Sequence, residues 1–157
     1  MRRLWRSMIR LYRESLVYIK EAKLVGIVLV SHGNMAEGMM DAARMIVGEM
    51  EGVVSVSLKE MDAVEDLMGR IETALKEAEK GDGVLILVDA FGASPFNASA
   101  RLAMDRKDIE VITGMNLPML LELAVQREGQ HLAAVTQIAL EAGTTSIRTL
   151  SQTLKND

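Results

Sequence analysis

An apolar run near the start of the chain, Leu24–Val30, constrains the fold more than any other feature. It consists of aliphatic residues and one glycine, and such a run is typical of a central strand of a parallel sheet, buried on both faces. The run stops at Ser31-His32-Gly33, and a helical pattern follows. The sequence therefore predicts a strand-to-helix corner of an α/β fold, with His32 at the end of the strand.

Strand and helix patterns alternate along the chain after this corner. We expect further strands at Val53–Leu58, Gly83–Val88 and Glu110–Thr113, and helices at 35–48, 63–80, 94–104, 118–127 and 131–142. This order favours a doubly wound, mainly parallel sheet with helices on both faces. Right-handed crossovers place the first and third strands side by side, which gives the strand order 2-1-3-4.

The third predicted strand ends at a second polar corner, which begins with Asp89 and runs to Ser94-Pro95. Parallel strands bring their carboxyl ends to one edge of a sheet, where open α/β folds bind ligands. Asp89 is then placed to accept a hydrogen bond from one ring nitrogen of His32, which leaves the other nitrogen free as a nucleophile. The plainer alternatives are a loop-capping histidine and a turn aspartate. Ser94 followed by Pro95 predicts a helix start with Ser94 as the N-cap.

The composition excludes several kinds of site. The chain has no cysteine, so disulfides and cysteine-based metal sites are excluded. Its two histidines, His32 and His131, lie far apart in the sequence without the spacing of metal ligands, and we expect His131 to be a surface or capping residue. No apolar run reaches the roughly 18 residues of a membrane span. Neither a phosphate-loop motif nor a dinucleotide fingerprint is present, so we expect no metal and no nucleotide cofactor.

The first 23 residues differ from the rest in charge. They carry a net charge of +5, whereas the whole chain carries −4 and the part from Leu24 onward therefore −9. Their apolar residues fall on one helical face and their arginines on another, as in a basic amphipathic helix that binds a membrane surface. The alternative is that translation begins at position 24, because bacteria also initiate at a codon for leucine. We expect residues 1–23 to be an extension and 24–157 to be the domain.

Three segments of the chain resemble the mannose-family IIA component of the bacterial sugar phosphotransferase system (PTS). They are Val30-Ser31-His32-Gly33, Leu87–Asn97 with its Gly-Ala-Ser-Pro-Phe-Asn stretch, and Gly114–Glu122 with Asn-Leu-Pro-Met. They occur in the order and spacing of that family, and the resemblance covers about Leu24 to Leu150. Together the three are far more specific than a lone Ser-His-Gly.

The resemblance implies roles for individual residues. His32 would carry the phosphoryl group on its Nε2 atom (tele-phosphohistidine), Asp89 would orient His32, and Ser94 would lie beside the phosphate. Gly33, Gly92 and Ala93 would lie against the phosphate as well, because glycines allow close approach of the backbone and helix N-termini favour anions. No cofactor is implied.

The resemblance also implies partners. The histidine phosphocarrier protein (HPr) would phosphorylate this cytoplasmic chain, which would pass the group to a IIB component on a separate polypeptide, since the chain ends at Asp157. The membrane subunits IIC and IID would be partners only indirectly, from the inner face of the membrane. The family is a homodimer that exchanges a C-terminal strand, for which Thr144–Leu150 is the candidate here. No nucleic acid is implied, and the sugar cannot be read, because a IIA protein does not contact it.

Three rival functions remain open at this point. One is a hydrolase, since Ser94, His32 and Asp89 are the residue types of a catalytic triad. However, Ser94 lacks the Gly-x-Ser-x-Gly elbow and has a predicted capping role. The others are a regulatory module that senses phosphorylation and a phosphocarrier that feeds a dihydroxyacetone kinase. The Pro95-Phe96-Asn97 stretch fits the sugar-transport branch better than the kinase branch.

Overall fold

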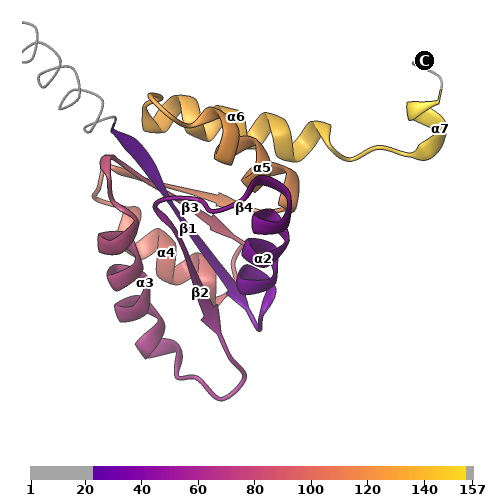
Figure 1. Cartoon of the computed structure of the whole chain (residues 1–157). Coiled ribbons are helices and arrows are strands. Elements are labelled where there is room, and N and C mark those ends of the chain that lie inside the picture. The colour runs from indigo at the N-terminus through magenta and orange to yellow at the C-terminus, as the bar shows by residue number, and fades with distance from the viewer. Residues whose placement is uncertain (1–22, 155–157) are drawn as a thin grey trace, which may run out of the picture.

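The computed structural model describes residues 23–154, and its centre is one four-stranded parallel sheet (Figure 1). The strands are β1 (Leu24–His32), β2 (Val53–Leu58), β3 (Gly81–Val88) and β4 (Ile109–Thr113), in the order β2-β1-β3-β4. The predicted strand order is therefore confirmed. The predicted extension, except for Lys23, lies outside the described residues.

Helices cover both faces of the sheet, as the alternating pattern predicted (Figure 1). They are α2 (Met35–Val47), α3 (Val64–Ala78), α4 (Ser94–Ala103), α5 (Leu117–Gln126), α6 (Leu132–Thr145) and the short α7 (Leu150–Thr153). Most boundaries lie within two residues of the predicted ones. The exception is α6, which continues three residues beyond the predicted end.

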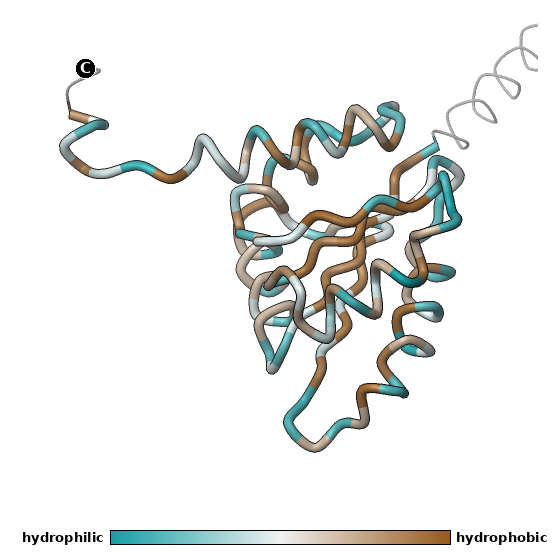
Figure 2. Tube along the Cα trace, turned by 180° about the vertical axis from the view of Figure 1, so that it is seen from behind, coloured by the Kyte–Doolittle hydropathy of each residue, from teal (hydrophilic) through white to brown (hydrophobic). Residues whose placement is uncertain are grey.

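The side chains of β1 divide the core into two apolar clusters. Successive residues of a strand point to opposite faces, and β1 is completely buried from Val25 to Ser31. Val25, Ile27 and Leu29 pack against α2, α5 and α6, whereas Val28 and Val30 pack against α3 and α4. Figure 2 shows the apolar strands in the centre of the molecule and the polar helix surfaces outside. The two-sided burial of β1 is what makes its residues a continuous apolar run.

Gly26 lets α3 approach the sheet closely. A Cβ atom at this position would lie 2.3 Å from the carbonyl oxygen of Ala78, the last residue of α3. The backbone at the end of α3 thus rests directly on β1. At the same end of the sheet the buried Arg127 guanidinium donates hydrogen bonds to the carbonyls of Val25 (2.6 Å) and Glu51. These contacts stabilise the edge of the sheet at which the strands begin. His32 and Asp89 lie at the opposite edge, where the strands end.

The predicted strand at Thr144–Leu150 is not formed in this chain. Thr144 and Thr145 belong to α6, and Leu150 begins α7. The hydroxyl groups of Thr144 and Thr145 donate to carbonyls one turn earlier in α6 (2.7 and 2.8 Å), and Thr149 forms a capping box for α7. Local hydrogen bonds thus favour helix over strand within the single chain. Exchange of this segment between two subunits stays a prediction.

Candidate active site

The carboxyl edge of the sheet brings His32 and Asp89 together. β1 pairs with β3 in parallel register, with Val30 opposite Val88, so β1 ends only two residues beyond the end of β3. One carboxylate oxygen of Asp89, Oδ2, lies 2.8 Å from His32 Nδ1 and also accepts a hydrogen bond from the His32 backbone N–H at 2.8 Å. Its other oxygen accepts from the backbone N–H of Ala90 at 2.8 Å. The hydrogen bond predicted between the two side chains is confirmed.

These hydrogen bonds determine the tautomer of His32. Burial alone would raise the pKa of the Asp89 carboxyl, but the hydrogen bonds from the His32 backbone and imidazole and from Ala90 outweigh burial and lower that pKa. Asp89 is therefore ionised at neutral pH and only accepts hydrogen bonds. In the neutral imidazole, Nδ1 of His32 therefore carries the proton and the lone pair is on Nε2. Because half of the imidazole side chain is exposed (49%), the ring is accessible to a reactant from solvent.

Ser31 supports the His32 corner, a role that our sequence reasoning did not identify. Its fully buried hydroxyl oxygen accepts a hydrogen bond from the backbone N–H of Ala36 at 2.8 Å, in the first turn of α2. Asn34 occupies the N-cap position, as predicted, but its side chain makes no capping hydrogen bond. The sequence feature that could have identified this role is a polar residue, Ser31, directly after an apolar strand.

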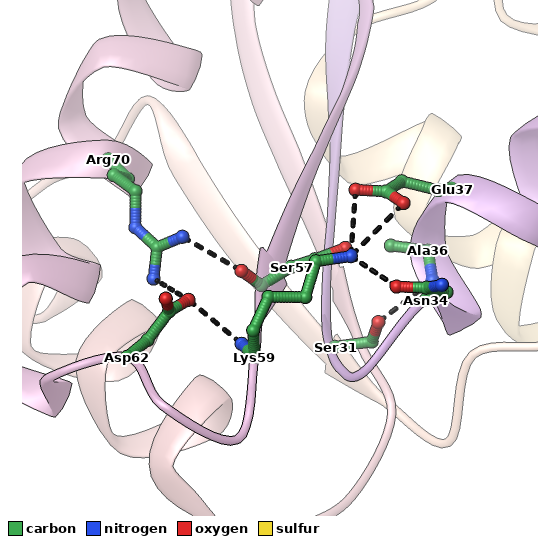
Figure 3. A network of polar contacts seen from close by, with 8 residues as sticks. All are labelled: Ser31, Asn34, Ala36, Glu37, Ser57, Lys59, Asp62 and Arg70. Atoms are coloured by element: carbon green, nitrogen blue, oxygen red, sulfur yellow. Dashed lines mark hydrogen bonds and ion pairs between the residues drawn. The ribbon is translucent and has the colours of Figure 1, made fainter.

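A polar network ties the end of β2 to the start of α2 (Figure 3). The Lys59 ammonium group donates hydrogen bonds to the Asn34 side-chain oxygen and to both carboxylate oxygens of Glu37 (3.2 Å each). The Leu58 carbonyl accepts from the Gly33 backbone N–H at 2.9 Å. Residues 33–37 are thus held against the end of β2 and the loop that follows it. Sequence reasoning missed Lys59, because nothing local to it indicates this contact.

The same network continues to α3 through Asp62. Its carboxylate accepts hydrogen bonds from the Lys59 backbone N–H (2.8 Å) and from the Arg70 guanidinium (2.9 Å), and the former chiefly lowers its pKa. Arg70 also donates to the Ser57 carbonyl at 2.9 Å. Figure 3 shows that these residues come from β2, α3 and the loop between them. The loop from β2 to α3 is therefore anchored at both ends.

Ser94 does not have the capping role that the sequence predicted. α4 begins at Ser94, the N-cap position falls on Ala93, and no side-chain hydrogen bond caps the helix. The helix begins one residue earlier than a Ser94 cap requires, and the Asn97 backbone N–H that such a cap would accept from bonds to the Ala93 carbonyl at 2.9 Å. The Asn97 side-chain N–H donates to the Gly92 carbonyl at 3.0 Å. The Ser94 hydroxyl makes no hydrogen bond to a described residue and is half-buried. It is thus available to another acceptor or donor.

The glycines predicted at the phosphate have open surroundings. Gly33 and Gly92 both have positive φ angles (56° and 76°), and no atom lies within 4 Å of where a Cβ would stand. The open space beside both residues allows a ligand to approach the backbone. Gly33 itself cannot donate its backbone N–H, because that group already bonds to the Leu58 carbonyl. Ala93 is half-buried at the N-terminus of α4.

The third corner has a structural role. Asn116 accepts a hydrogen bond from the Met119 N–H at 3.2 Å and caps α5, and it also donates to the Gly143 carbonyl of α6. His131 caps α6 through Nδ1, which accepts from the Ala134 N–H at 3.1 Å, as expected. Among residues 23–154 no group of three potential metal ligands occurs. Nor is any helix in that range long and apolar enough to cross a bilayer.

Replacing Ser31 by alanine should destabilise the domain by about 1–2 kcal/mol. The change leaves the Ala36 N–H without its buried hydrogen-bond partner, and loss of a cap costs about that much. Urea unfolding of parent and variant measures the difference. Ser99→Ala in α4 is a matched control: its buried hydroxyl donates to the Pro95 carbonyl (2.7 Å), so no N–H loses a partner. An equal or smaller loss for Ser31→Ala would contradict the capping role.

Comparison with known proteins identifies relatives over most of the chain. A family model described as "PTS system fructose IIA component" matches residues 26–140. The mannose-specific EIIAB component of Escherichia coli strain K12 is 34% identical over 127 residues, or 80% of this chain. The sorbose-specific EIIA component of Lacticaseibacillus casei is 35% identical over 107 residues, 68% of this chain and 77% of that protein.

The solved structures include proteins with the same fold. The phosphotransferase system component EIIA from Streptococcus agalactiae superposes with a TM-score of 0.75 at 26% identity, covering 82% of this chain and 99% of that chain. The match to the Escherichia coli protein, in contrast, spans only 39% of its length.

Proposed function

Since this chain belongs to the mannose-type family of PTS IIA components, we propose that it is a phosphocarrier that accepts and passes on a phosphoryl group at Nε2 of His32. The observation that carries the proposal is the hydrogen bond between His32 Nδ1 and Asp89, which in the neutral ring puts the lone pair on Nε2 of a half-exposed side chain. An uncharged imidazole nitrogen is a nucleophile at neutral pH. The proposed donor is HPr and the proposed acceptor a IIB component.

In the forward step the Nε2 lone pair attacks the phosphorus atom of phosphorylated HPr. The new bond joins Nε2 to phosphorus, the bond between phosphorus and the HPr nitrogen breaks, and its electron pair returns to HPr. The His32 ring gains positive charge as the bond forms, while Nδ1 keeps its proton. The Asp89 carboxylate at 2.8 Å stabilises that charge. In the second step a nucleophile of the IIB component takes the phosphoryl group and Nε2 recovers its lone pair.

Several groups at the carboxyl edge of the sheet suit a phosphoryl group. The Ser94 hydroxyl is a donor without a described partner, and Gly33 and Gly92 leave open space beside the backbone. The N-termini of α2 and α4 lie at the ends of β1 and β3, and a helix N-terminus favours an anion. Positioning and electrostatics of this kind provide most of the catalysis in phosphoryl transfer.

The test is to locate the phosphoryl group. The protein is incubated with phosphoenolpyruvate, enzyme I and HPr, and peptides are mapped by mass spectrometry under alkaline conditions, where phosphohistidine survives. We expect a single phosphoryl group on the peptide that contains His32. Addition of a IIB component should then remove it. Absence of label with an active HPr, or label elsewhere, would contradict the proposal.

The rival functions are less well supported. The free Ser94 hydroxyl removes one argument against a hydrolase, but the chain has no nucleophile elbow and no hydrogen bond joins Ser94 to His32 among the described residues. The relatives named above are sugar components, which favours sugar transport over a dihydroxyacetone kinase. A regulatory module would be labelled by HPr without passing the group on, so transfer to IIB separates it from a carrier.

The proposal includes the setting in which the carrier works. We place it in the cytoplasm, as a homodimer, with the membrane subunits as indirect partners through IIB. Residues 1–23 would be an extension to the domain 24–157, and their basic charge would bind anionic lipid weakly and with strong salt sensitivity.

A chain that starts at Leu24 should transfer phosphoryl groups at the full-length rate. The sheet, all three corners and the core clusters lie within residues 24–154. The measurement is the rate of transfer from HPr for both chains, with vesicle sedimentation of the full chain as a second readout. A large loss of rate on truncation would mean that the extension contacts the domain, and the extension would not be dispensable.

A further inference from the structure

The free edge of β2 presents backbone groups that no other strand uses. β2 lies at the edge of the sheet and pairs only with β1. The carbonyls of Gly52 and Leu58 accept hydrogen bonds from the β1 side (2.8 and 2.9 Å). Since alternate residues of a strand direct their backbone groups to the same side, the N–H and C=O groups of Val53, Ser55 and Ser57 point away from β1.

The chain's own side chains close only the carboxyl end of this edge. The Ser57 carbonyl accepts a hydrogen bond from Arg70 at 2.9 Å, and the Lys59 N–H donates to Asp62 at 2.8 Å (Figure 3). Among residues 23–154, no group bonds to the N–H or C=O of Ser55 on this side. The earlier part of the edge is therefore open to another strand.

The other edge strand, β4, is protected by its own side chain. The Asp108 carbonyl accepts from β3 at 2.8 Å, so the groups of Val111 point away from β3. There the Glu110 carboxylate accepts a hydrogen bond from the Val111 N–H at 2.9 Å. β2, in contrast, contains neither a charged residue nor a proline, which are the usual protection of an edge strand.

A groove of about 530 Å³ runs along the open edge, between β2 and α3. Ser57 and Arg70, which line it, each hold a buried polar atom without a hydrogen-bond partner among the described residues. These atoms are Ser57 Oγ, in a residue that is 6% exposed, and Arg70 Nε. Because buried polar atoms are nearly always hydrogen-bonded, they indicate a polar ligand in the groove.

The groove carries uncompensated negative charge at both ends. Asp66 in the first turn of α3 and Glu77 in its last turn line the groove, are exposed, and form no ion pair with a described residue. The two basic residues of the lining, Lys59 and Arg70, are already paired with other carboxylates. The helix carbonyls next to Glu77 add partial negative charge. A ligand that fits this groove is therefore basic at two points.

We infer that the open edge of β2 binds an extended segment of a partner protein, which adds a strand to the sheet and carries two basic side chains four residues apart. Asp66 and Glu77 lie about 16 Å apart along α3. Residues i and i+4 of a strand share a face and span about 13 Å, a distance that long basic side chains extend to match. In such strand addition, main-chain hydrogen bonds provide affinity and alternate side chains specificity.

A second copy of this edge is a poorer occupant, because pairing β2 with β2 would bring the acidic residues of both copies together. The inference goes beyond the proposed function, since none of its steps involves His32.

The test uses a labelled synthetic peptide with capped ends, Gly-Lys-Val-Thr-Val-Lys-Gly, as the probe at physiological salt. We expect it to bind the full chain with a dissociation constant below about 1 mM, as measured by fluorescence anisotropy. Binding should slow hydrogen exchange of the Ser55 amide at least about tenfold, because that N–H gains a partner. The same peptide with glutamate in place of both lysines is the control and should not bind.

Two variants locate the binding site. The double variant Asp66→Lys, Glu77→Lys should weaken binding about tenfold or more. Its matched control is Glu65→Lys, Glu72→Lys, which makes the same charge change at exposed positions of α3 outside the groove lining and should bind nearly like the parent. Ser55→Pro removes the free N–H at an edge position, where proline is tolerated, and should abolish binding.

Several results would overturn the inference. They are no binding at several millimolar peptide, equal binding of the glutamate peptide, and parental affinity in Asp66→Lys, Glu77→Lys. These charged positions are exposed, so the test stands even if Ser55→Pro does not fold. Protection of the Ser55 amide that rises with protein concentration alone would show that a second copy occupies the edge, which also excludes a partner strand. No outcome depends on phosphoryl transfer, so the proposed function is tested separately.

Discussion

His32→Ala is expected to abolish phosphorylation by HPr completely, with labelling below about one thousandth of the parent. Removing the nucleophile leaves no alternative acceptor, because the remaining histidine, His131, uses the lone pair of Nδ1 to cap α6. Alanine should be tolerated, since the His32 side chain is half-exposed and contributes little to the core. The measurement is stoichiometric transfer from phosphorylated HPr, followed by gel or mass spectrometry.

The matched control is His131→Asn, which removes the other histidine and keeps a side chain that caps helices well. It should be labelled like the parent. Label that persists in His32→Ala would contradict the assignment of His32 as the acceptor, and loss of label in His131→Asn would contradict its purely structural role. The pair thus tests both histidines of the chain.

The sheet was predictable because its signals are local. Strands that are buried on both faces appear in the sequence as continuous apolar runs. Parallel pairing of these strands then determines which strand-to-helix corners lie at the same edge of the sheet. That is why His32 and Asp89, which are 57 residues apart in sequence, could be placed together before their contact was seen. The family motifs added the roles of the residues, which geometry does not supply.

The differences arose where a local pattern allows more than one outcome, or where a partner lies in another segment. The N-cap pattern at Ser94-Pro95 is locally reasonable, yet α4 begins one residue earlier, with Ala93 as the N-cap and the Asn97 backbone N–H bonded to the Ala93 carbonyl. Lys59 acts through partners in another segment, which no local pattern shows. Ser31 bonds to Ala36 only five residues along the chain, and its signal was the polar residue in an apolar run. At Thr144–Leu150 the family resemblance implied a strand exchanged between subunits. In the single chain α6 continues to Thr145, with threonine hydroxyl groups that bond one turn back, and the exchange stays a prediction.

Asp89→Asn should slow phosphoryl transfer by about 10²–10⁴-fold and leave the fold intact. The amide is nearly the same size as the carboxylate, but it carries no charge and offers an N–H₂ group as well as an oxygen. His32 Nδ1 can then accept from that amide, which moves the ring proton to Nε2 and removes the nucleophile. Loss of the negative charge also removes the stabilisation of the positive ring as phosphorus bonds. Rapid-quench measurement of transfer from HPr gives the rate, and circular dichroism checks the fold.

The same variant has a second signature in its pH dependence. The hydrogen bonds from His32 and Ala90 lower the Asp89 pKa in the folded protein despite its partial burial. A lowered carboxyl pKa contributes stability above the pKa of the unfolded chain, and that contribution is lost as the pH falls through the folded value. The parent should therefore lose more stability than Asp89→Asn between neutral and acidic pH, as measured by urea unfolding. A transfer rate within about threefold of the parent, together with identical acid sensitivity, would show that Asp89 neither orients His32 nor stabilises its charge.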